Sequence, residues 1–367
     1  MSEHESHRAS REAKSAATRS AAPVSRHDAA LTRYLGAAQH EALHDAGWHT
    51  WVQPPPVHPA PPKPVELKPI TAEVSRQPRA DLVVVGIDGS AHAAMAARWA
   101  AVEADLRGAA LRLVYAYSVP IAGYAGYSMA PDGLGHVMRI EGEHMLKAVA
   151  NEIRAQHPTL QVDTRLMQGD AVLALLRESA RARLTVVGSR GNGRMAGVLL
   201  GSVATAVSAH GTAPVAVIPT EGPGWPHDGA VVVGVDGSSG NEIAIRFAFE
   251  QAAFRGAELV AVHTWNHPRP SQDGVLDMAA LDRDERIRLS EDLAGWHERY
   301  PDVVVRQQVR QGKATAVLLS IARTAQLLVV GSRGRGGFAG MVLGSTSQSL
   351  ISHAVCPVVV VRPNSLD

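Results

Sequence analysis

The sequence contains the same glycine-rich segment twice, and this repeat limits the possible folds more than any other feature. The first copy runs from Leu184 to Ser202 and the second from Leu327 to Ser345, both with the spacing Gly-x2-Gly-x9-Gly-Ser. In each copy a β-branched apolar run precedes the first glycine, which is typical of a buried strand. The Gly-x2-Gly permits a turn in which backbone comes close to a ligand. The final Gly-Ser precedes an amphipathic segment and predicts the start of a helix.

A second segment is also repeated, about a hundred residues before each glycine motif. It reads Leu82-Val-Val-Val-Gly-Ile-Asp88-Gly-Ser in the first copy and Ala230-Val-Val-Val-Gly-Val-Asp236-Gly-Ser in the second. Asp88 and Asp236 lie 148 positions apart, whereas the first glycines of the two motifs lie 143 apart. Two homologous modules therefore follow one another. The predicted regions are an N-terminal extension over residues 1–79 and two domains over residues 80–220 and 228–364.

Strands and helices alternate through each module, and five strands are expected in each. Such alternation requires crossover connections and predicts a parallel sheet covered on both faces, a doubly wound α/β domain. Ligands of these sheets bind beyond the carboxyl ends of the strands, where the winding reverses. The loops after the first and fourth strands both lie there and are expected to line one crevice per module.

Apolar spacing also predicts which helix and strand faces are buried. The first helix of each module carries an apolar stripe that we expect to face the core: Met95, Trp99, Val102 and Leu106 in one, Ile243, Phe247 and Phe254 in the other. The last strands, Val215–Ile218 and Val358–Val361, would be apolar edges prone to aggregation if uncovered. We therefore expect the two modules to pack on each other through these strands.

The first 79 residues differ in texture from the rest. The proline-dense stretch from Pro54 to Pro64 favours an extended, solvated linker, so this Pro/His-rich extension is expected to be largely disordered. One short helix is predicted between Ala30 and Val52, within which His40 and His44 have a spacing that suits a metal. Further ligands at suitable spacing are missing, so two solvent-facing histidines are the preferred interpretation and no metal site is predicted.

Composition excludes several classes of function. Thirty-six Lys and Arg against thirty-five Asp and Glu give a net charge near +1, and aromatic residues make up 4% of the chain. Neither value favours a nucleic-acid or membrane partner. The single cysteine, Cys356, precedes a proline in an apolar run and is expected to be a buried, inert thiol. With no signal-like segment and no run of eighteen apolar residues, a cytoplasmic location is expected.

The glycine motif followed by a helix start suits a phosphate group, because the first N–H groups of a helix are unpaired and its dipole is positive there. A carboxylate after the first strand can accept hydrogen bonds from a ribose or a base, so each module is interpreted as a nucleotide site. The alternatives are glycine loops that only turn the chain, and an Asp that only caps the next helix. Arg190 and Arg333 lie in the loops and can reach phosphate, although exposed loop arginines are equally ordinary.

Two other phosphate motifs are excluded. A P-loop needs Gly-x4-Gly-Lys-Ser/Thr, but the only Gly-Lys pair, at Gly312, is followed by Ala314. A dinucleotide fingerprint needs Gly-x-Gly-x-x-Gly after the first strand, where this chain has Gly-Ile-Asp-Gly or Gly-Val-Asp-Gly. No catalytic set is evident either, so the chain is not expected to be an enzyme.

These motifs resemble the universal stress protein family in its ATP-binding, tandem form. The resemblance covers Asp81 to Pro363, and the stretch Gly331-Ser-Arg-Gly-Arg-Gly-Gly-Phe-Ala-Gly-Met-Val-Leu-Gly-Ser looks like actinobacterial members. It implies a five-stranded parallel sheet of order 3-2-1-4-5 in each domain and ATP as the ligand, with Mg²⁺ as a candidate companion. It also implies a regulatory role in stress or dormancy and pairing through the last strands, within the chain or in a homodimer. The extension lies outside the resemblance and is a candidate binding segment for an unknown protein.

Carried over by position, the resemblance implies two sets of binding residues. Gly86 with Asp88, and Gly234 with Asp236, would flank adenine and ribose, while Ala116 and Thr264 would meet the adenine edge through their backbone. Phosphates would lie against Gly188, Arg190, Gly191, Gly201, Ser202 and Val203 in the first module. In the second they would lie against Gly331, Arg333, Gly334, Gly344, Ser345, Thr346 and Ser347. Ala204 stands where the second module has Ser347, so the first site lacks a possible hydroxyl contact.

Two other functions remain open at this point. One is a slow ATPase or another nucleotide-hydrolysing enzyme of the same fold, although the loops of the pyrophosphatases and nucleotidyl transferases that share it are missing. The other is an interaction protein whose sites hold no nucleotide.

Overall fold

The computed structural model describes residues 81–119, 131–191, 200–219, 228–238, 240–266, 277–334, 342–363 and 365. The predicted N-terminal extension, with its short helix and its histidine pair, lies outside these residues. None of the helices in the described ranges is both long enough and apolar enough to cross a membrane.

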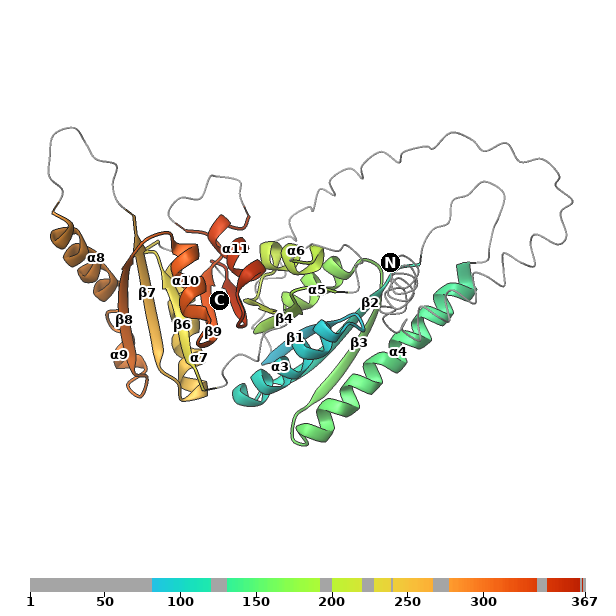
Figure 1. Ribbon diagram of the computed structural model, residues 1–367. Helices are drawn as coiled ribbons and strands as arrows, with labels where there is room; N and C mark the ends of the chain where they lie inside the picture. Colours follow the sequence, from blue (N-terminus) through green and yellow to red (C-terminus); the bar gives the residue numbers. More distant parts are fainter. Residues whose placement is uncertain are drawn as a thin grey trace, which may run out of the picture. The chain divides into compact units, whose positions relative to one another are not determined.

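The first module alternates strands and helices as its apolar periodicity predicts (Figure 1). Its strands are β1 (Leu82–Ile87), β2 (Ala110–Tyr117), β3 (Val162–Gln168), β4 (Leu184–Gly188) and β5 (Val215–Ile218). Its described helices are α3 (Ala91–Arg107), α4 (Pro131–Gln156), α5 (Ala171–Ser179) and α6 (Ser202–His210).

The second module repeats this order with one additional short helix. Its strands are β6 (Ala230–Val235), β7 (Leu259–Trp265), β8 (Val305–Gln311), β9 (Ala325–Gly331) and β10 (Val358–Val361). Its described helices are α7 (Asn241–Arg255), α8 (Met278–Asp292), α9 (Trp296–Arg299), α10 (Ala314–Ala322) and α11 (Ser345–His353).

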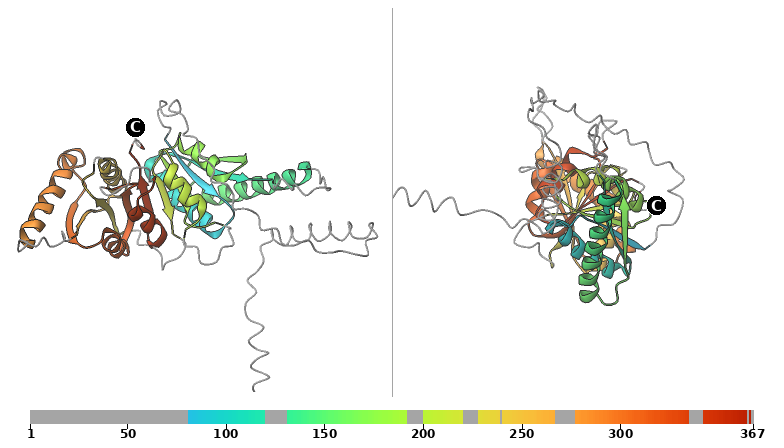
Figure 2. Two further views of the ribbon diagram at one scale, coloured as in Figure 1. Left: turned by 90° about the horizontal axis from the view of Figure 1, so that it is seen from above. Right: turned by 90° about the vertical axis from the view of Figure 1, so that its right-hand side faces the viewer.

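All ten strands form one continuous sheet, in the order β3-β2-β1-β4-β5-β10-β9-β6-β7-β8. Each half has the predicted order 3-2-1-4-5, and the pairs within a half are parallel. The halves join through β5 and β10, which run antiparallel with Val358 opposite Val217 and Val359 opposite Ala216 (Figure 2). The predicted packing of the two last strands is therefore present, and neither strand is left as an apolar edge.

Helices cover both faces of the sheet and separate the core into two layers. Helices α3, α4, α7, α8 and α9 contribute to the layer on one face, which contains the large buried side chains of Phe247, Phe249 and Leu289. Helices α5, α6, α10 and α11 contribute to the other, which contains Leu175, Leu318 and Leu350. Because α3 follows β1 on one face and α6 follows β4 on the other, the winding reverses between two adjacent strands.

The predicted apolar stripe of α3 is wrong in its outer half. Trp99 is buried, but Val102 is 48% exposed and Leu106 39% exposed. The buried face consists mostly of alanines, which let the helix axis approach the sheet closely. In α7, Phe247 is buried as predicted, whereas Phe254 is 42% exposed and lies under the guanidinium of Arg107 at 5.3 Å. The stripe was predicted from the large apolar side chains, whereas most of the buried residues of α3 are alanines.

A buried charge lies where α3 meets α7, between the two modules. Glu103 is fully buried and accepts hydrogen bonds from Arg107 Nε and Arg255 Nη2, both at 2.6 Å, and from Gln251 Nε2 at 2.9 Å. Burial alone raises the pKa of this carboxyl, but the charges and hydrogen bonds of Arg255 and Arg107 outweigh it and lower the pKa from 4.5 to about 2. Glu103 is therefore ionised inside the molecule and links the modules.

Candidate functional site

Each module has a pocket at the carboxyl ends of its central strands, where the sheet winding reverses. The first has a volume of about 570 Å³ and the second about 210 Å³. Strands β1, β2 and β4 and helices α3, α5 and α6 line the first, and their counterparts line the second. This is the crevice in which open α/β sheets bind ligands.

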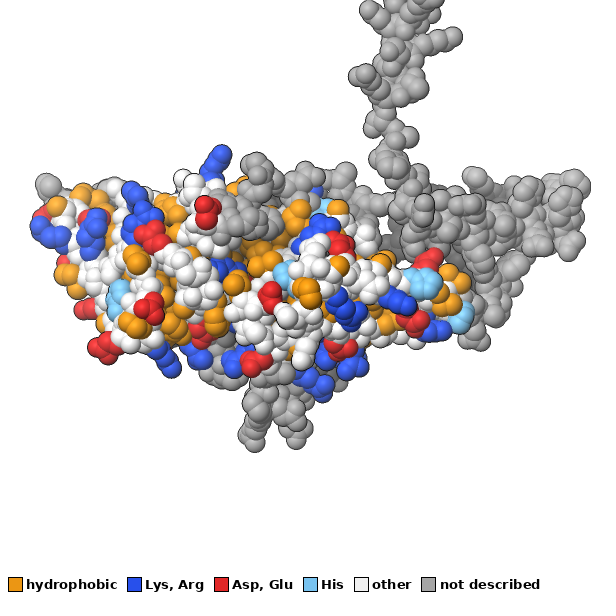
Figure 3. Space-filling view, turned by 90° about the horizontal axis from the view of Figure 1, so that it is seen from below, with side chains coloured by type: hydrophobic (Ala, Val, Ile, Leu, Met, Phe, Trp, Pro, Cys, Tyr) orange, Lys and Arg blue, Asp and Glu red, His pale blue; other side chains and the backbone are white. Residues whose placement is uncertain are grey.

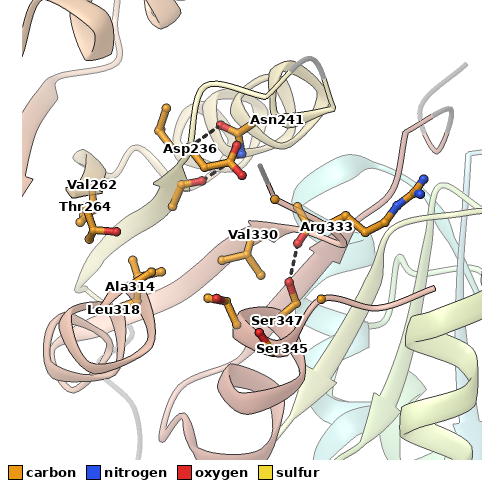
Figure 4. Close-up of a pocket in the computed structure, with 16 residues that line it drawn as sticks. Asp236, Asn241, Val262, Thr264, Ala314, Leu318, Val330, Arg333, Ser345 and Ser347 are labelled. Carbon is orange, nitrogen blue, oxygen red and sulfur yellow. Dashed lines mark hydrogen bonds between the residues drawn. The ribbon is translucent and has the colours of Figure 1, made fainter. Parts of the chain in front are cut away.

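The structure brings all the predicted residues of each module together. The first pocket is lined by Gly86, Asp88, Ala116, Gly188, Arg190, Gly191, Gly201, Ser202 and Val203. The second is lined by Gly234, Asp236, Thr264, Gly331, Arg333, Gly334, Gly344, Ser345, Thr346 and Ser347 (Figure 4). Their position in one pocket is thus a structural fact, whereas their contact with a nucleotide stays a prediction.

The aspartate after the first strand forms a turn and does not cap the helix. Asp88 Oδ1 accepts a hydrogen bond from the backbone N–H of Ser90 at 2.9 Å. Ser90 is the N-cap of α3, because its hydroxyl oxygen accepts from the N–H of Ala93 at 3.1 Å. In the second module Asp236 Oδ1 accepts from both the N–H and the hydroxyl of Ser238, at 3.0 and 2.8 Å. Both aspartates therefore lie in the turn before the helix, but neither caps the helix, so the alternative of a capping aspartate is wrong.

The second glycine of each loop lies against that carboxylate. A β-carbon at Gly334 would stand 2.5 Å from Asp236 Oδ2, and one at Gly191 would overlap Asp88 Oδ2. Real β-carbons do not come so near another atom, so only glycine allows the loop to touch the carboxylate. The strand-end aspartate and the glycine motif, a hundred residues apart in sequence, thus form one wall of each pocket.

A helix begins at the other side of each glycine loop. Gly201 and Gly344 are the N-caps of α6 and α11, and neither helix has a side-chain cap among the described residues. The N–H of each glycine donates to the loop carbonyl, of Ser189 at 2.7 Å and of Ser332 at 2.8 Å. The N–H groups that follow are those a helix leaves unpaired, which suits an anion. Both glycines have φ of −71°, so alanine at Gly344 meets no left-handed strain.

Two arginines add positive charge beside the second pocket. Arg333 lies in the glycine loop. In Figure 4 it lies on the opposite side of the pocket from Thr264, and its side chain points outward, away from Thr264. Burial lowers the pKa of Arg362, and the nearby charge of Arg333 lowers it further. Two guanidinium groups that repel each other in this way favour an anion near them.

Several lining residues were missed by sequence reasoning. Most have an apolar or small side chain, and one, Asn241, is a polar residue at the start of a helix. They are Val114, Ala171 and Leu175 in the first pocket, and Asn241, Val262, Ala314, Leu318 and Val330 in the second. Leu175 and Leu318 pack against the glycine at the end of β1 or β6, whose β-carbon would stand 3.1 Å away. The 143-residue repeat pairs these leucines, which is a signal that could have found them.

The hydroxyl of Ser347 forms a hydrogen bond within the protein. Its Oγ donates to the carbonyl oxygen of Gly331 at 2.6 Å, so it ties the first turn of α11 to the end of β9. Ala204 cannot make the equivalent bond to Gly188. The difference between the modules at this position therefore concerns how firmly the loop is held.

Comparison with known proteins decides the family. A sequence model described as the universal stress protein family matches residues 80–219 and again residues 229–362. The chain belongs to the universal stress protein family. A universal stress protein of Mycobacterium tuberculosis is 40% identical over 287 residues, which cover 76% of this chain and 96% of the relative. One of Mycobacterium bovis is 38% identical over 299 residues, covering 76% and 94%.

Solved structures agree on the fold of this universal stress protein. The crystal structure of a universal stress protein from Archaeoglobus fulgidus matches with a TM-score of 0.58 and 23% identity, covering 77% of this chain and 99% of that one. At this identity the match shows the fold alone. The share of each chain that is covered is consistent with two tandem modules in both proteins.

Proposed function

We propose that each module binds an adenine nucleotide and that the chain acts as a regulatory binding protein. The observation that carries the proposal is the contact between the strand-end aspartate and the second loop glycine, because it recurs in both modules. This contact places a carboxylate, a glycine loop and an uncapped helix start around one pocket. A carboxylate can accept from ribose or base, and the helix start can bind phosphate.

The described walls fit such a ligand at both ends. The phosphate end has the N–H groups of α6 or α11 and, in the second module, the loop residue Arg333. The other end has apolar walls, such as Val262 and Leu318, that suit a flat base. The family resemblance selects adenine. Mg²⁺ would arrive with the phosphates, since the described residues contain no cluster of three or more metal-binding side chains.

The ionisable residues that line the two pockets favour a regulatory role over catalysis. Among the described lining residues, Asp88 and Asp236 are the carboxylates, and each accepts hydrogen bonds from the serine two positions later. Neither pocket has a histidine or a second carboxylate among its described lining residues, so neither aspartate has a partner there that could relay a proton. On the face drawn in Figure 3, basic and acidic side chains of the described residues are interspersed, which does not favour a nucleic-acid partner.

The test is titration calorimetry of the full chain with ATP and ADP, with GTP as the matched control for the base. Two ATP per chain and weaker or absent GTP binding are expected. No detectable heat at millimolar ATP would reject nucleotide binding. Phosphate release should stay below the roughly 1 to 1000 per second of ordinary enzymes, and a rate inside that range would establish the ATPase alternative.

A further inference from the structure

The two pockets are built from equivalent elements but differ in size. The first, at about 570 Å³, is more than twice as large as the second, at about 210 Å³. Pockets that enclose small organic ligands have volumes of roughly 300 to 1,000 Å³, so the first has room to enclose a whole ligand, whereas the second encloses only part of one. The strand order and registers of the two halves correspond, so side chains at equivalent positions can be compared directly.

Four apolar residues of the first pocket are replaced by polar ones in the second. The replacements, at equivalent positions of the repeat, are Ala93 by Asn241, Ala116 by Thr264, Val203 by Thr346 and Ala204 by Ser347. Three of the four add heavy atoms to a position where the first module has only a methyl group. The volume of the second pocket falls accordingly.

Asn241 is held in place and cannot move aside for a ligand. It is 3% exposed, its Nδ2 donates to the carbonyl oxygen of Gly234 at 3.0 Å, and its Oδ1 accepts from the N–H of Asp236 at 3.4 Å. Rotating this side chain would leave a buried carbonyl and amide unpaired, which costs free energy. Ala93 forms no such bonds, so the first pocket has no equivalent obstacle.

The added atoms of Thr264 lie away from the phosphate end, whereas those of Asn241 lie between Asp236 and the glycine loop, with Nδ2 3.8 Å from where a β-carbon of Gly331 would stand. In Figure 4, Asn241 lies beside Asp236, and Thr264 lies beside Val262 on the opposite side of the pocket from Arg333. The helix start at Ser345 takes the phosphates on electrostatic grounds. The nucleoside must therefore lie where the second pocket is narrower.

We propose that the first pocket accepts an adenine nucleotide enlarged on its base, whereas the second accepts only the unmodified nucleotide. The inference rests on the proposed nucleotide binding and adds size selectivity to it. The two modules would then differ in specificity. The second would bind only the unmodified adenine nucleotide, and the first would also bind adenine nucleotides with a substituent on the base.

The experiment compares ATP with N6-benzyl-ATP on the full chain, by equilibrium dialysis and calorimetry. We expect two ATP but one N6-benzyl-ATP per chain, with the analogue bound to the second pocket roughly ten- to hundredfold more weakly than ATP. Two tight equivalents of the analogue, or none, would overturn the inference while leaving nucleotide binding intact. A chain that binds neither compound would instead reject the proposed function.

The chain supplies its own matched variants. The double change Asn241→Ala and Thr264→Ala should raise the analogue stoichiometry from one to two. The reverse change, Ala93→Asn with Ala116→Thr, should lower it from one to none, while ATP still binds the second module. Circular dichroism checks that each variant is folded, and the two arms are independent, so either one tests the inference. An analogue stoichiometry that stays at one in both folded variants would show that these residues do not set the size limit.

Discussion

Gly334 lies where the carboxylate of Asp236 leaves no room for a β-carbon. Asp236 cannot simply turn away, because its Oδ1 accepts two hydrogen bonds from Ser238. Gly334→Ala should therefore displace the carboxylate or the loop and abolish nucleotide binding at the second module. Calorimetry should show one ATP per chain instead of two, and the matched change Gly191→Ala should do the same to the first module.

Gly344→Ala is the structural control for this residue-scale prediction. Its φ is ordinary, but its β-carbon would stand 3.3 Å from the backbone oxygen of Ser332, which is a tight contact, so a small fall in the melting temperature is expected. If Gly334→Ala still bound two ATP with unchanged affinity, the contact between loop and carboxylate would have no role in the site.

The buried Glu103 predicts how stability depends on pH. Its folded pKa of about 2 lies below the ordinary value of 4.5, so its contribution is complete above about pH 4.5 and is lost as pH falls toward 2. The loss should be on the order of 3 kcal/mol of unfolding free energy. Urea titrations between pH 6 and pH 2.5 measure it by comparing wild type with Glu103→Gln.

The control for Glu103 is Glu152, whose pairing with Arg98 is exposed. Glu152→Gln should keep the wild-type pH profile, because exposed pairs contribute little. A Glu103→Gln variant with the same acid sensitivity as wild type would show that other carboxyl groups cause the acid loss.

At the scale of elements, the starts of α5 and α10 differ at one equivalent position. Asp170 caps α5 by accepting from the N–H of Leu173 at 2.9 Å, whereas the N-cap of α10 is Lys313, which makes no side-chain cap. Lysine there also opposes the helix dipole. Lys313→Asp should stabilise the chain by about 1 kcal/mol, and Asp170→Lys should destabilise it by a similar amount.

The midpoint of urea unfolding measures both variants, with Lys313→Ala as the control. The alanine variant removes the unfavourable charge without adding a cap, so it should lie between wild type and Lys313→Asp. A stabilisation by alanine equal to that by aspartate would assign the effect to charge alone.

The elements also show which features of the fold and the site can be predicted from the sequence and which cannot. Strand runs, helix starts and the repeat predicted two doubly wound modules and placed Asp88 and the glycine motif at one crevice, whereas the strand order came from the family resemblance. The buried face of α3 was not predictable by size, because alanines such as Ala96 and Ala100 pack as tightly as larger residues. Asn241 was missed because one polar residue at the start of a helix looks like an exposed one until the strand ends close around it.

At the scale of the whole molecule, the two modules meet with approximate two-fold symmetry, in which the sequence exchanges the charge at one position. Arg107 and Arg255 lie 148 residues apart, and so do Glu103 and Gln251. Arg107 stacks over Phe247 at 5.3 Å and Arg255 over Trp99 at 5.9 Å, again at equivalent positions. The carboxylate of Glu103 accepts hydrogen bonds from both arginines and from the amide of Gln251.

This symmetry predicts that the carboxylate can be moved to the other helix. Glu103→Gln alone leaves two buried guanidinium groups without a carboxylate and should cost about 3 to 5 kcal/mol. Adding Gln251→Glu to that variant restores one carboxylate and one amide with their helices exchanged: the new carboxylate lies four residues before Arg255 and across from Arg107. The double variant should therefore regain most of the lost unfolding free energy, measured by urea unfolding at pH 7. If the unfolding free energies lost in the two single variants simply add in the double variant, the carboxylate is stabilised only by the surroundings of Glu103 on α3. The two modules are then not interchangeable at this contact.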